Sequence, residues 1–425
     1  MAQLILYGLP LGWLTLLLLV RYRSRKVVRI RTRSARALDR ISTACRDLGW
    51  RAEAVGEEDT SVCADLSWTS SRRTPCLPTR AWNRLGGSRC FEDKRILGEV
   101  LSSSVIEESK DGPGGLDRRP RHLECVSIGS PDDFETWWAR PNVTKRVWVL
   151  KDALANGGCG LWFIDREASS DRDFALQVIR GKSEAGFTLQ EYLPGRPLLW
   201  QGRKFHFRVG GVVTATGRAY LHRTAFVHPA NKDFVDDPIA LKDPGVHVTN
   251  LCVNLGLNDP SRFVGEIRED LPTDRPNLWP RMLQLWGDVV STCFKLMKVQ
   301  RSALDFEYIG LDMIANDEGE VFLIEANCPP ALASATGYAH ANAMHDEILF
   351  DLFRYLVLPP LLTEMDDQAT AAVDQHRGGW FACPTTVQQD QLVYTGDYRK
   401  AQASCELALM MHLNRLRKNR TKNVL

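Results

Sequence analysis

The 425-residue sequence lacks several features that would place a protein in a special class. It has no C-x-x-C pair, and its 11 cysteines stand apart, with no histidines at zinc-binding spacing. We therefore expect neither a disulfide framework nor a zinc site, and scattered reduced thiols favour a cytosol-like compartment. The sequence also lacks an excess of either charge. Its formal net charge of +2 gives no global argument for nucleic acid as a partner.

A long apolar run is found only at the start of the sequence. Residues 4–20 carry no charge, and a basic run follows at once, with no acid before Asp39. This order is the reverse of that in a cleaved signal peptide, and it favours a membrane anchor in residues 1–20 with the basic side facing the cytoplasm. A sequence that targets the protein to an organelle and a wrongly assigned first exon are the alternatives.

The rest of the chain has an ordinary globular composition, 44% apolar and 25% charged, over a length that suits two or three domains. Residues 21–78 are rich in Arg, Ser, Thr and acids with little apolar period, so we interpret them as a basic, variable or disordered segment. From residue 146 onward, short apolar strands follow one another. Residues 278–300 place apolar side chains three or four apart, which predicts a helix.

A predicted hairpin near residue 320 raises the first chemical question. The stretches "FEYIGLDMIAN" and "EVFLIEANCPP" read as two antiparallel strands joined by the turn "NDEGE". Pairing would bring Asp312 and Glu325 to the same end of the sheet, and Asn327 would share the face of Glu325. Three hard oxygen ligands of this kind suit Mg²⁺ when phosphates complete the shell. Salt-bridged or solvated acids are the alternative.

A phosphate site is predicted on earlier strands. In "VWVLKDALANGGCGLWFI", Lys151 precedes a loop in which Gly157 and Gly158 let backbone N–H groups approach phosphate oxygens. In "GRKFHFRVGGVV", Lys204, His206 and Arg208 alternate with apolar residues and so share one strand face. Neighbouring cations on one face favour an anionic ligand. Donors on later strands extend the set: Arg223, His247, Thr249 and Asn250.

This ordered set of motifs resembles the tubulin tyrosine ligase-like family of ATP-grasp ligases. The motifs are, in chain order, "WVLKD…NGGCGLWFI", "LQEYLPGRPLLWQGRKFHFRV", "YLHRTAF", "HVTN", "FEYIGLDM" and "LIEANCPP". They cover roughly residues 146–335, and a weaker echo in "RAWNRLGGSRCFEDKRIL" extends the resemblance to about residue 80. The implied fold class is α+β (α/β). It consists of an ATP-grasp fold of antiparallel sheets with flanking helices, preceded by a small N-terminal α/β domain and the short apolar segment.

The resemblance implies a role for each matching position. ATP would contact Lys94 and Lys151, lie along Gln190, Glu191 and Tyr192, and be approached by Lys204 and His206, with His247, Thr249 and Asn250 at its phosphate end. Arg208 and Arg223 would be catalytic, and Mg²⁺ would bind Asp312, Glu325 and Asn327. Two positions depart from the family: His206 replaces a common Asp, and Cys328 replaces a smaller or polar residue. These departures affect the expected identity of the protein substrate more than the expected ligation chemistry.

The implied activity is ligation of a free amino acid to a protein carboxylate through an acyl phosphate, and the acidic tail of tubulin is one candidate acceptor. We expect residues 79–145 to form the N-terminal domain of this family, 146–355 the ATP-grasp region and 356–425 a C-terminal extension with a basic tail. A non-catalytic ATP-binding scaffold and a ligase acting on a small peptide are the alternatives. Neither the amino acid nor the oligomeric state follows from the sequence.

Overall fold

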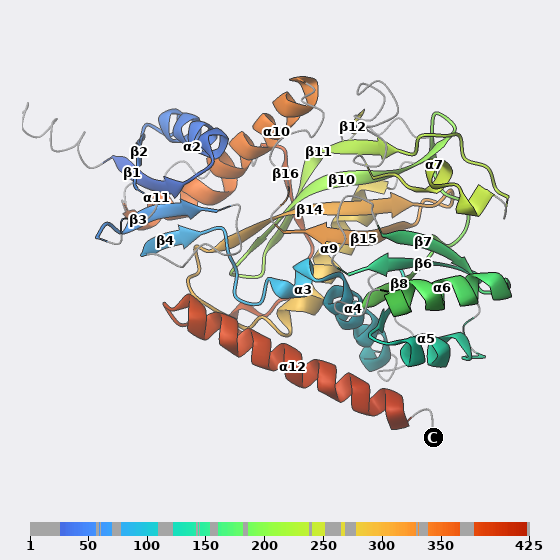
Figure 1. Cartoon of the computed structure of the whole chain (residues 1–425). Coiled ribbons are helices and arrows are strands. Elements are labelled where there is room, and N and C mark those ends of the chain that lie inside the picture. Colours follow the sequence, from blue (N-terminus) through green and yellow to red (C-terminus); the bar gives the residue numbers. More distant parts are fainter. Residues whose placement is uncertain are drawn as a thin grey trace, which may run out of the picture. The chain divides into compact units, whose positions relative to one another are not determined.

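The computed structural model describes residues 26–422 except 57–58, 60, 70–77, 109–121, 142, 144, 154–159, 182–185, 238–239, 251–264, 268–277, 329, 331–338 and 366–377. The chain divides into two compact units. Unit 1 consists of Met1–Asn83 and Leu349–Gly378, and unit 2 consists of Arg84–Ile348 and Gly379–Leu425. Figure 1 labels the strands and helices along the chain.

Unit 1 contains a parallel four-stranded sheet in the order β2-β1-β3-β4. Helix α2 begins after Ser34, whose hydroxyl accepts a hydrogen bond from the backbone N–H of Ala37 and so caps the helix. In the later part of the unit, Phe353 packs edge-on against Trp68 at 5.1 Å between ring centroids. The elements are β1 (Val27–Thr32), α2 (Ala35–Asp47), β2 (Arg51–Ala54), β3 (Ala64–Trp68), β4 (Thr79–Trp82), the π-helical turn η3 (Leu352–Val357) and α11 (Leu358–Met365).

The interpretation of residues 21–78 as poorly ordered was wrong for most of the described part, because three strands and a helix lie there. Their basic composition concealed the structure. Arg31 is only 5% exposed, and its guanidinium donates to the backbone carbonyls of Asp59, Val62 and Pro78. An arginine that bonds several carbonyls can lie inside a fold without a carboxylate partner. The predicted domain boundaries otherwise stay predictions.

An antiparallel seven-stranded sheet forms the centre of unit 2. Strands β12, β11, β10, β14 and β15 follow one another across it, while β16 pairs with β11 and β9 pairs with β10. Helix α9 (Leu278–Phe294) lies in the same apolar core as the inward side chains of these strands, which confirms the predicted helix. The strands are β9 (Leu199–Trp200), β10 (Arg203–Thr214), β11 (Ala219–Pro229), β12 (Gly265–Ile267), β14 (Phe306–Ala315), β15 (Val321–Asn327) and β16 (Trp380–Cys383).

A second antiparallel sheet in unit 2 has the order β5-β8-β6-β7. Its core contains Trp148 from β6 and Trp137 from α5, whose ring centroids are 5.1 Å apart. Figure 1 shows α5 and α6 beside this sheet. The elements are β5 (Cys125–Ile128), α5 (Pro131–Trp138), β6 (Val147–Asp152), β7 (Leu161–Asp165), α6 (Ser169–Gly181) and β8 (Phe187–Glu191).

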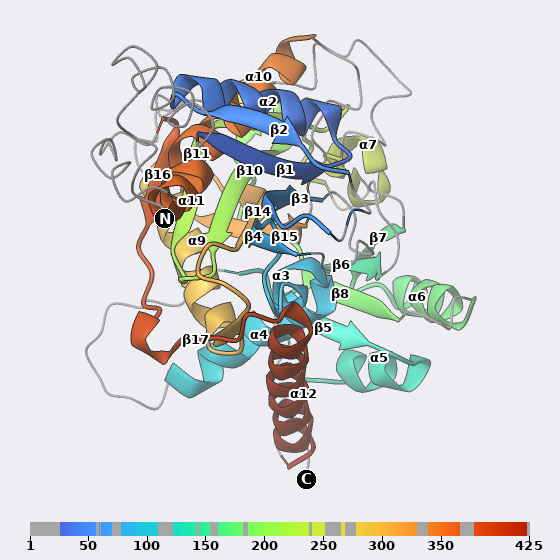
Figure 2. The ribbon, with the colours of Figure 1, turned by 90° about the vertical axis from the view of Figure 1, so that its left-hand side faces the viewer.

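The C-terminal part of unit 2 is more than an extension with a basic tail. Strand β16 completes the central sheet, and the long helix α12, at the bottom of Figure 2, buries Ala401, Cys405 and Leu409 on one face. The remaining elements are α3 (Arg89–Glu92), α4 (Lys94–Glu108), η1 (Ala240–Lys242), α7 (Pro244–His247), β13 (Val299–Gln300), α10 (Ala339–Asp351), η5 (Gln389–Gln391), β17 (Val393–Tyr394) and α12 (Tyr398–Lys422).

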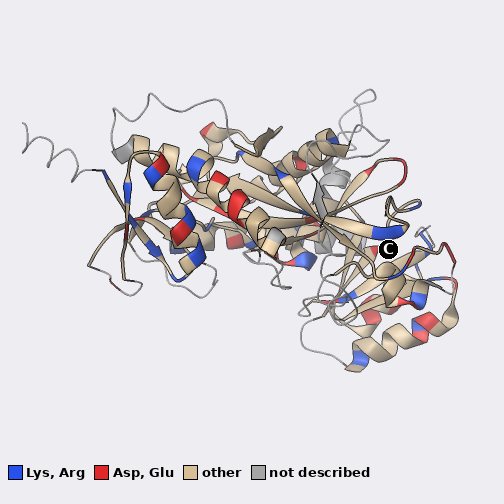
Figure 3. Cartoon of the chain, turned by 90° about the horizontal axis from the view of Figure 1, so that it is seen from above, with Lys and Arg blue, Asp and Glu red and all other residues tan. Residues whose placement is uncertain are grey.

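Charged residues of both signs are interspersed along the ribbon in Figure 3, in keeping with the small net charge. Residues 4–20 lie outside the described part of the chain, so the membrane anchor stays a prediction. Within the described ranges, no helix combines the length and the apolar character needed to cross a bilayer.

Candidate active site

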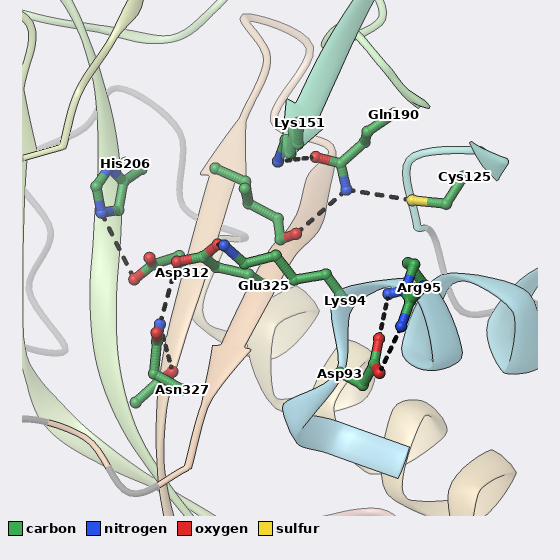
Figure 4. Close-up of polar contacts among 12 residues, drawn as sticks. Asp93, Lys94, Arg95, Cys125, Lys151, Gln190, His206, Asp312, Glu325 and Asn327 are labelled. Atoms are coloured by element: carbon green, nitrogen blue, oxygen red, sulfur yellow. Dashed lines mark hydrogen bonds and ion pairs between the residues drawn. The ribbon is translucent and has the colours of Figure 1, made fainter. Parts of the chain in front are cut away.

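The predicted hairpin is confirmed and brings its three polar residues to one end. Strands β14 and β15 pair antiparallel, with Asp312 opposite Glu325 and Gly310 opposite Asn327. The Nδ2 atom of Asn327 donates to Oε1 of Glu325 at 3.3 Å (Figure 4). Because positions two apart share a strand face, the three side chains gather where the sequence placed them. We call Asp312, Glu325 and Asn327 the hairpin acid cluster.

Both carboxylates of the hairpin acid cluster have cationic partners. Arg208, directly across from Asp312 in the ladder between β10 and β14, grips it with two hydrogen bonds, of which Nη2 to Oδ2 measures 2.9 Å. Lys94, at the start of α4, lies 3.0 Å from Oε2 of Glu325. Burial alone would raise the pKa of Asp312. The charge of Arg208, the His206 ring and hydrogen bonds from both hold that pKa well below its usual range.

Lys151 has a neutral partner instead. Its Nζ atom lies 2.5 Å from Oε1 of Gln190 on the neighbouring strand β8. The Nε2 atom of Gln190 donates to the carbonyl of Ile324 at 3.2 Å and to Sγ of Cys125 at 3.4 Å (Figure 4). The pairing between β14 and β15 shifts register beside Ile324, and such an irregularity leaves a carbonyl open to a side-chain donor. Burial lowers the pKa of Lys151, against the opposing charge of Glu325.

Lys204 also has neutral partners. Its Nζ atom donates to the backbone carbonyl of His247 at 3.2 Å and lies 4.2 Å from the centre of the Tyr192 ring. The Tyr192 hydroxyl is in turn 2.9 Å from Nδ1 of His247. Burial, together with the nearby charge of Lys151, lowers the pKa of Lys204 to about 7. We call Lys151 and Lys204 the neutral-partner lysines.

His206 connects the predicted phosphate end to the hairpin acid cluster. Its Nδ1 atom is 2.7 Å from the hydroxyl of Thr249, and its Nε2 atom is 3.5 Å from Oδ1 of Asp312. Asn250 follows Thr249 and is partly buried. The alternation on β10 is therefore confirmed: Phe205, Phe207 and Val209 face the core, while Lys204, His206 and Arg208 make the polar contacts.

A small pocket that opens to solvent lies beside these residues. Lys94, Lys151 and Glu325 line its polar part, and Leu97 of α4 and Leu323 of β15 contribute to its apolar wall. The hydroxyl of Thr188, a residue 2% exposed, lines the pocket without a hydrogen-bond partner among the described residues. Cations thus lie at one side of this pocket and aliphatic side chains at the other.

One predicted catalytic residue, Arg223, is not brought into contact with these residues. Arg223 lies on β11, the strand next to β10, as predicted, but Phe226 is the residue opposite Arg208. Arg223 is half-buried, and its side chain makes no hydrogen bond or ion pair with any described residue. Gly157 and Gly158 lie outside the described residues, although Gly160 closes their loop with a positive φ of 67°. Glu191 lies 3.0 Å from Lys145, so a neighbouring cation already pairs with it.

Sequence reasoning missed three residues of the site: Cys125, Thr188 and His228. Thr188 precedes Gln190 by two positions on β8, so strand alternation would have placed both on one face. His228 stands opposite His206 in the ladder, with ring centroids 4.9 Å apart, and the pairing of β10 with β11 would have revealed it. Cys125 gave no signal, because its contact with Gln190 depends on the pairing of β5 with β8.

The donor set of the hairpin acid cluster fits Mg²⁺, because carboxylate and amide oxygens are the ligands this ion prefers. Two carboxylates on facing strands also leave coordination positions for water and phosphate. Among the described residues, no group of three or more His, Cys, Asp or Glu side chains is arranged to hold a metal ion. The proposed set has two such residues, Asp312 and Glu325, because its third member is an asparagine. The metal assignment therefore stays a prediction.

Comparison with solved structures identifies the class of fold. The C-terminal domain of Pby1 from K. lactis, an ATP-grasp enzyme that interacts with the mRNA decapping enzyme Dcp2, superposes with a TM-score of 0.61. The match covers 85% of this chain and 99% of that domain at 14% sequence identity. Two antiparallel sheets with flanking helices and this neighbour together show that the chain has the ATP-grasp fold, as predicted.

The sequence signature of the Tubulin-tyrosine ligase family matches residues 127–365, more than half of the chain. The chain belongs to the Tubulin-tyrosine ligase family, as the motifs predicted. Similar proteins include the probable alpha-tubulin polyglutamylase Ttll1 of Tetrahymena thermophila, 25% identical over 47% of this chain and 51% of that protein. Human tubulin monoglycylase TTLL3 is 23% identical over 45% of this chain and 26% of that protein. The chain thus spans about half or less of the length of these curated relatives.

Proposed function

We propose that the chain is an ATP-dependent ligase that joins an amino acid to a carboxylate of a protein. One observation carries the proposal: four cations, Lys94, Lys151, Lys204 and Arg208, are held on or beside the strands that carry Asp312 and Glu325. Cations beside a pair of acids suit a nucleotide triphosphate with its metal and a second anionic substrate. Membership of the family and the ATP-grasp fold support this reaction class.

In the proposed reaction, the acceptor carboxylate attacks the γ-phosphorus of ATP, which gives an acyl phosphate and ADP. The amino group of the incoming amino acid then attacks the acyl carbon, loses a proton and displaces phosphate, so that an amide forms. Negative charge develops on phosphoryl and carboxylate oxygens in both steps. Fixed cations in a partly buried site stabilise such charge without having to reorganise. Positioning and electrostatics thus supply most of the barrier reduction.

Each part of the site has a proposed role. The neutral-partner lysines would bind phosphate oxygens, and the adenine would lie along residues 190–192. The hairpin acid cluster would hold Mg²⁺, which would neutralise phosphate charge when bound. Arg208 would exchange its grip on Asp312 for the reacting carboxylate or phosphoryl group, since its planar fork suits both. Lys94 would likewise leave Glu325 and bind an anionic group of the substrates.

A ligation assay tests the proposal. Purified protein would be incubated with ATP, Mg²⁺ and each of tyrosine, glutamate and glycine in radiolabelled form, with either purified tubulin or a small peptide as the acceptor. We expect one amino acid to enter the tubulin band with stoichiometric release of ADP. A label on a small peptide acceptor alone would favour the peptide-ligase alternative. ATP binding without ligation to any acceptor would favour a scaffold and contradict the proposal.

A further inference from the structure

Lys204 differs from the other cations of the site in the groups that it contacts. Lys94 and Arg208 each contact a carboxylate, and Lys151 contacts the side-chain amide of Gln190. Among the described residues, Lys204, only 7% exposed, has one hydrogen-bond acceptor, the carbonyl of His247, and one aromatic face, that of Tyr192. An ammonium group has three donors and is costly to bury when most of them lack acceptors.

Among the described residues, the elements packed around Lys204 bring no carboxylate into contact with it, and the nearby charge of Asp236 acts on the Tyr192 hydroxyl. Beyond β8, Tyr192 presents its ring, and burial raises the pKa of its hydroxyl, so this group stays neutral. From α7, His247 presents its carbonyl, and from β6, Lys151 adds a like charge. On β10 itself, His206 shares the face of Lys204, and His228 of β11 lies across from His206. Leu199 of β9 stands opposite Lys204 and is apolar.

We propose that Lys204 takes up a proton from solvent when the phosphates of the nucleotide bind, so that the site gains a positive charge only when its ligand is present. This inference rests on the proposed function. The neutral amine is favoured in the free protein by burial and by Lys151. A phosphate oxygen within hydrogen-bond distance would supply the missing counter-charge and favour the ammonium form. The step is a simple protonation of Nζ, with the proton supplied by the buffer.

The lowered pKa of Lys204, about 7, sets the size of the effect. At pH 8 about nine-tenths of the free protein would carry neutral Lys204, and at pH 6 about one-tenth would. Binding of a ligand that requires the charged form would therefore take up about 0.9 proton at pH 8 and about 0.1 at pH 6. The dissociation constant would rise about ten-fold between these pH values. Ionisation of phosphate itself changes affinity in the opposite direction.

Calorimetry tests this inference with magnesium ATP as the probe. Titrations in two buffers of different ionisation enthalpy, at pH 6 and at pH 8, give the number of protons taken up. Lys204→Arg keeps its charge at both pH values, so the variant should take up almost no proton at pH 8, and its change in affinity between pH 6 and pH 8 should report only the ionisation of phosphate. Lys204→Met carries no ionisable group and should show the same pH dependence as Lys204→Arg. Lys298→Arg, at an exposed lysine that bonds Gln391, is the matched control and should retain the uptake of the parent. Lys151→Arg tests the neighbouring lysine in the same way.

The outcomes separate this inference from the proposed function. Binding by the parent without proton uptake at pH 8, or with the same change in affinity between pH 6 and pH 8 as Lys204→Arg, would overturn the inference and leave the proposed function standing. Uptake that persists in Lys204→Arg but disappears in Lys151→Arg would assign the proton to the other lysine and overturn it as well. No binding of nucleotide by the parent at either pH would overturn both.

Discussion

The cations in two neighbouring regions of unit 2 have different kinds of partner. In the hairpin region, Arg208 and Lys94 are paired with the carboxylates of Asp312 and Glu325. In the second region, Lys151 of β6 has an amide as its partner, and Lys204 of β10 has a carbonyl and an aromatic ring. A paired cation must leave its carboxylate before it binds a ligand, whereas a cation with neutral partners keeps most of its attraction for an anion.

This difference indicates a division of labour. The neutral-partner lysines are placed to bind phosphate directly, Lys204 in its protonated form. In the hairpin region, by contrast, cations hold the acids in position and would be displaced when metal and substrate arrive. The hairpin region, which is neutralised internally, should therefore govern chemistry and the dependence of binding on Mg²⁺. The neutral-partner lysines should govern affinity for the nucleotide itself. Substitutions that exchange an acid for an amide, or an amide for an acid, convert one kind of region into the other.

Glu325→Gln should have the largest effect. It gives Lys94 an amide as its partner, as Lys151 has, in place of a carboxylate. Removal of the carboxylate deprives Lys94 of its charged partner and Mg²⁺ of a ligand, so we expect magnesium-dependent ATP turnover to fall by at least about a hundred-fold. Steady-state ADP release measures it, and circular dichroism checks the fold. Glu318→Gln, an exposed position in the turn of the same hairpin, is the matched control and should keep full turnover.

Arg208→Lys should affect ligation more than binding. Lysine keeps the charge but loses the planar fork that grips Asp312 and, in the proposed reaction, a carboxylate or phosphoryl group. We expect a loss of ligation on the order of a hundred-fold with ATP affinity within a few-fold of the parent. Arg223→Lys should behave in the same way if Arg223 acts on the same group. Parallel loss of affinity and ligation would instead make either arginine a nucleotide anchor.

Lys151→Ala should weaken nucleotide binding itself. A hydrogen bond to a charged group contributes roughly 1.5–3 kcal/mol, so we expect affinity to fall about ten-fold to about a hundred-fold. Fluorescent-nucleotide titration measures it. Lys298→Ala removes an exposed lysine that also bonds a glutamine, Gln391, and should change nothing. An unaltered dissociation constant for Lys151→Ala in a folded protein would remove Lys151 from the phosphate site.

Gln190→Glu is the reverse exchange and should have the smallest effect. A carboxylate beside Lys151 would neutralise it as Glu325 neutralises Lys94, so ATP affinity should fall about ten-fold. The exposed pair of Lys298 and Gln391 provides the control, Gln391→Glu, which should leave affinity unchanged. Equal or tighter binding by Gln190→Glu would show that the neutral partner of Lys151 has no bearing on nucleotide affinity.

Local patterns were enough to predict much of this site. Alternation along β10 and the turn between β14 and β15 fixed which side chains share a face, because both depend on residues close in sequence. The partner of each cation was harder to predict. Lys94 meets Glu325 only because α4 lies beside the end of β15, and Gln190 reaches Ile324 only because the ladder shifts register there. Such contacts depend on tertiary packing, which no short motif encodes.

The N-terminal sheet was missed for a related reason. Arg31 and Asp65 lie inside unit 1, where Arg31 bonds backbone carbonyls and a carboxylate oxygen of Asp65 accepts from the backbone N–H of Arg29. Charged side chains at such positions interrupt the apolar alternation by which a strand is recognised. Buried charged residues that bond backbone groups thus made the sequence of an ordered sheet look like that of a disordered segment.

The most direct test of the division of labour is the effect of magnesium on nucleotide affinity in the parent and in Glu325→Gln. ATP dissociation constants would be measured by calorimetry with Mg²⁺ and with a chelator. The account predicts that Mg²⁺ tightens binding to the parent by about ten-fold or more, while the variant binds ATP with or without Mg²⁺ at nearly the same affinity. If Mg²⁺ tightened binding to Glu325→Gln as much as to the parent, the hairpin acid cluster would not be the metal site.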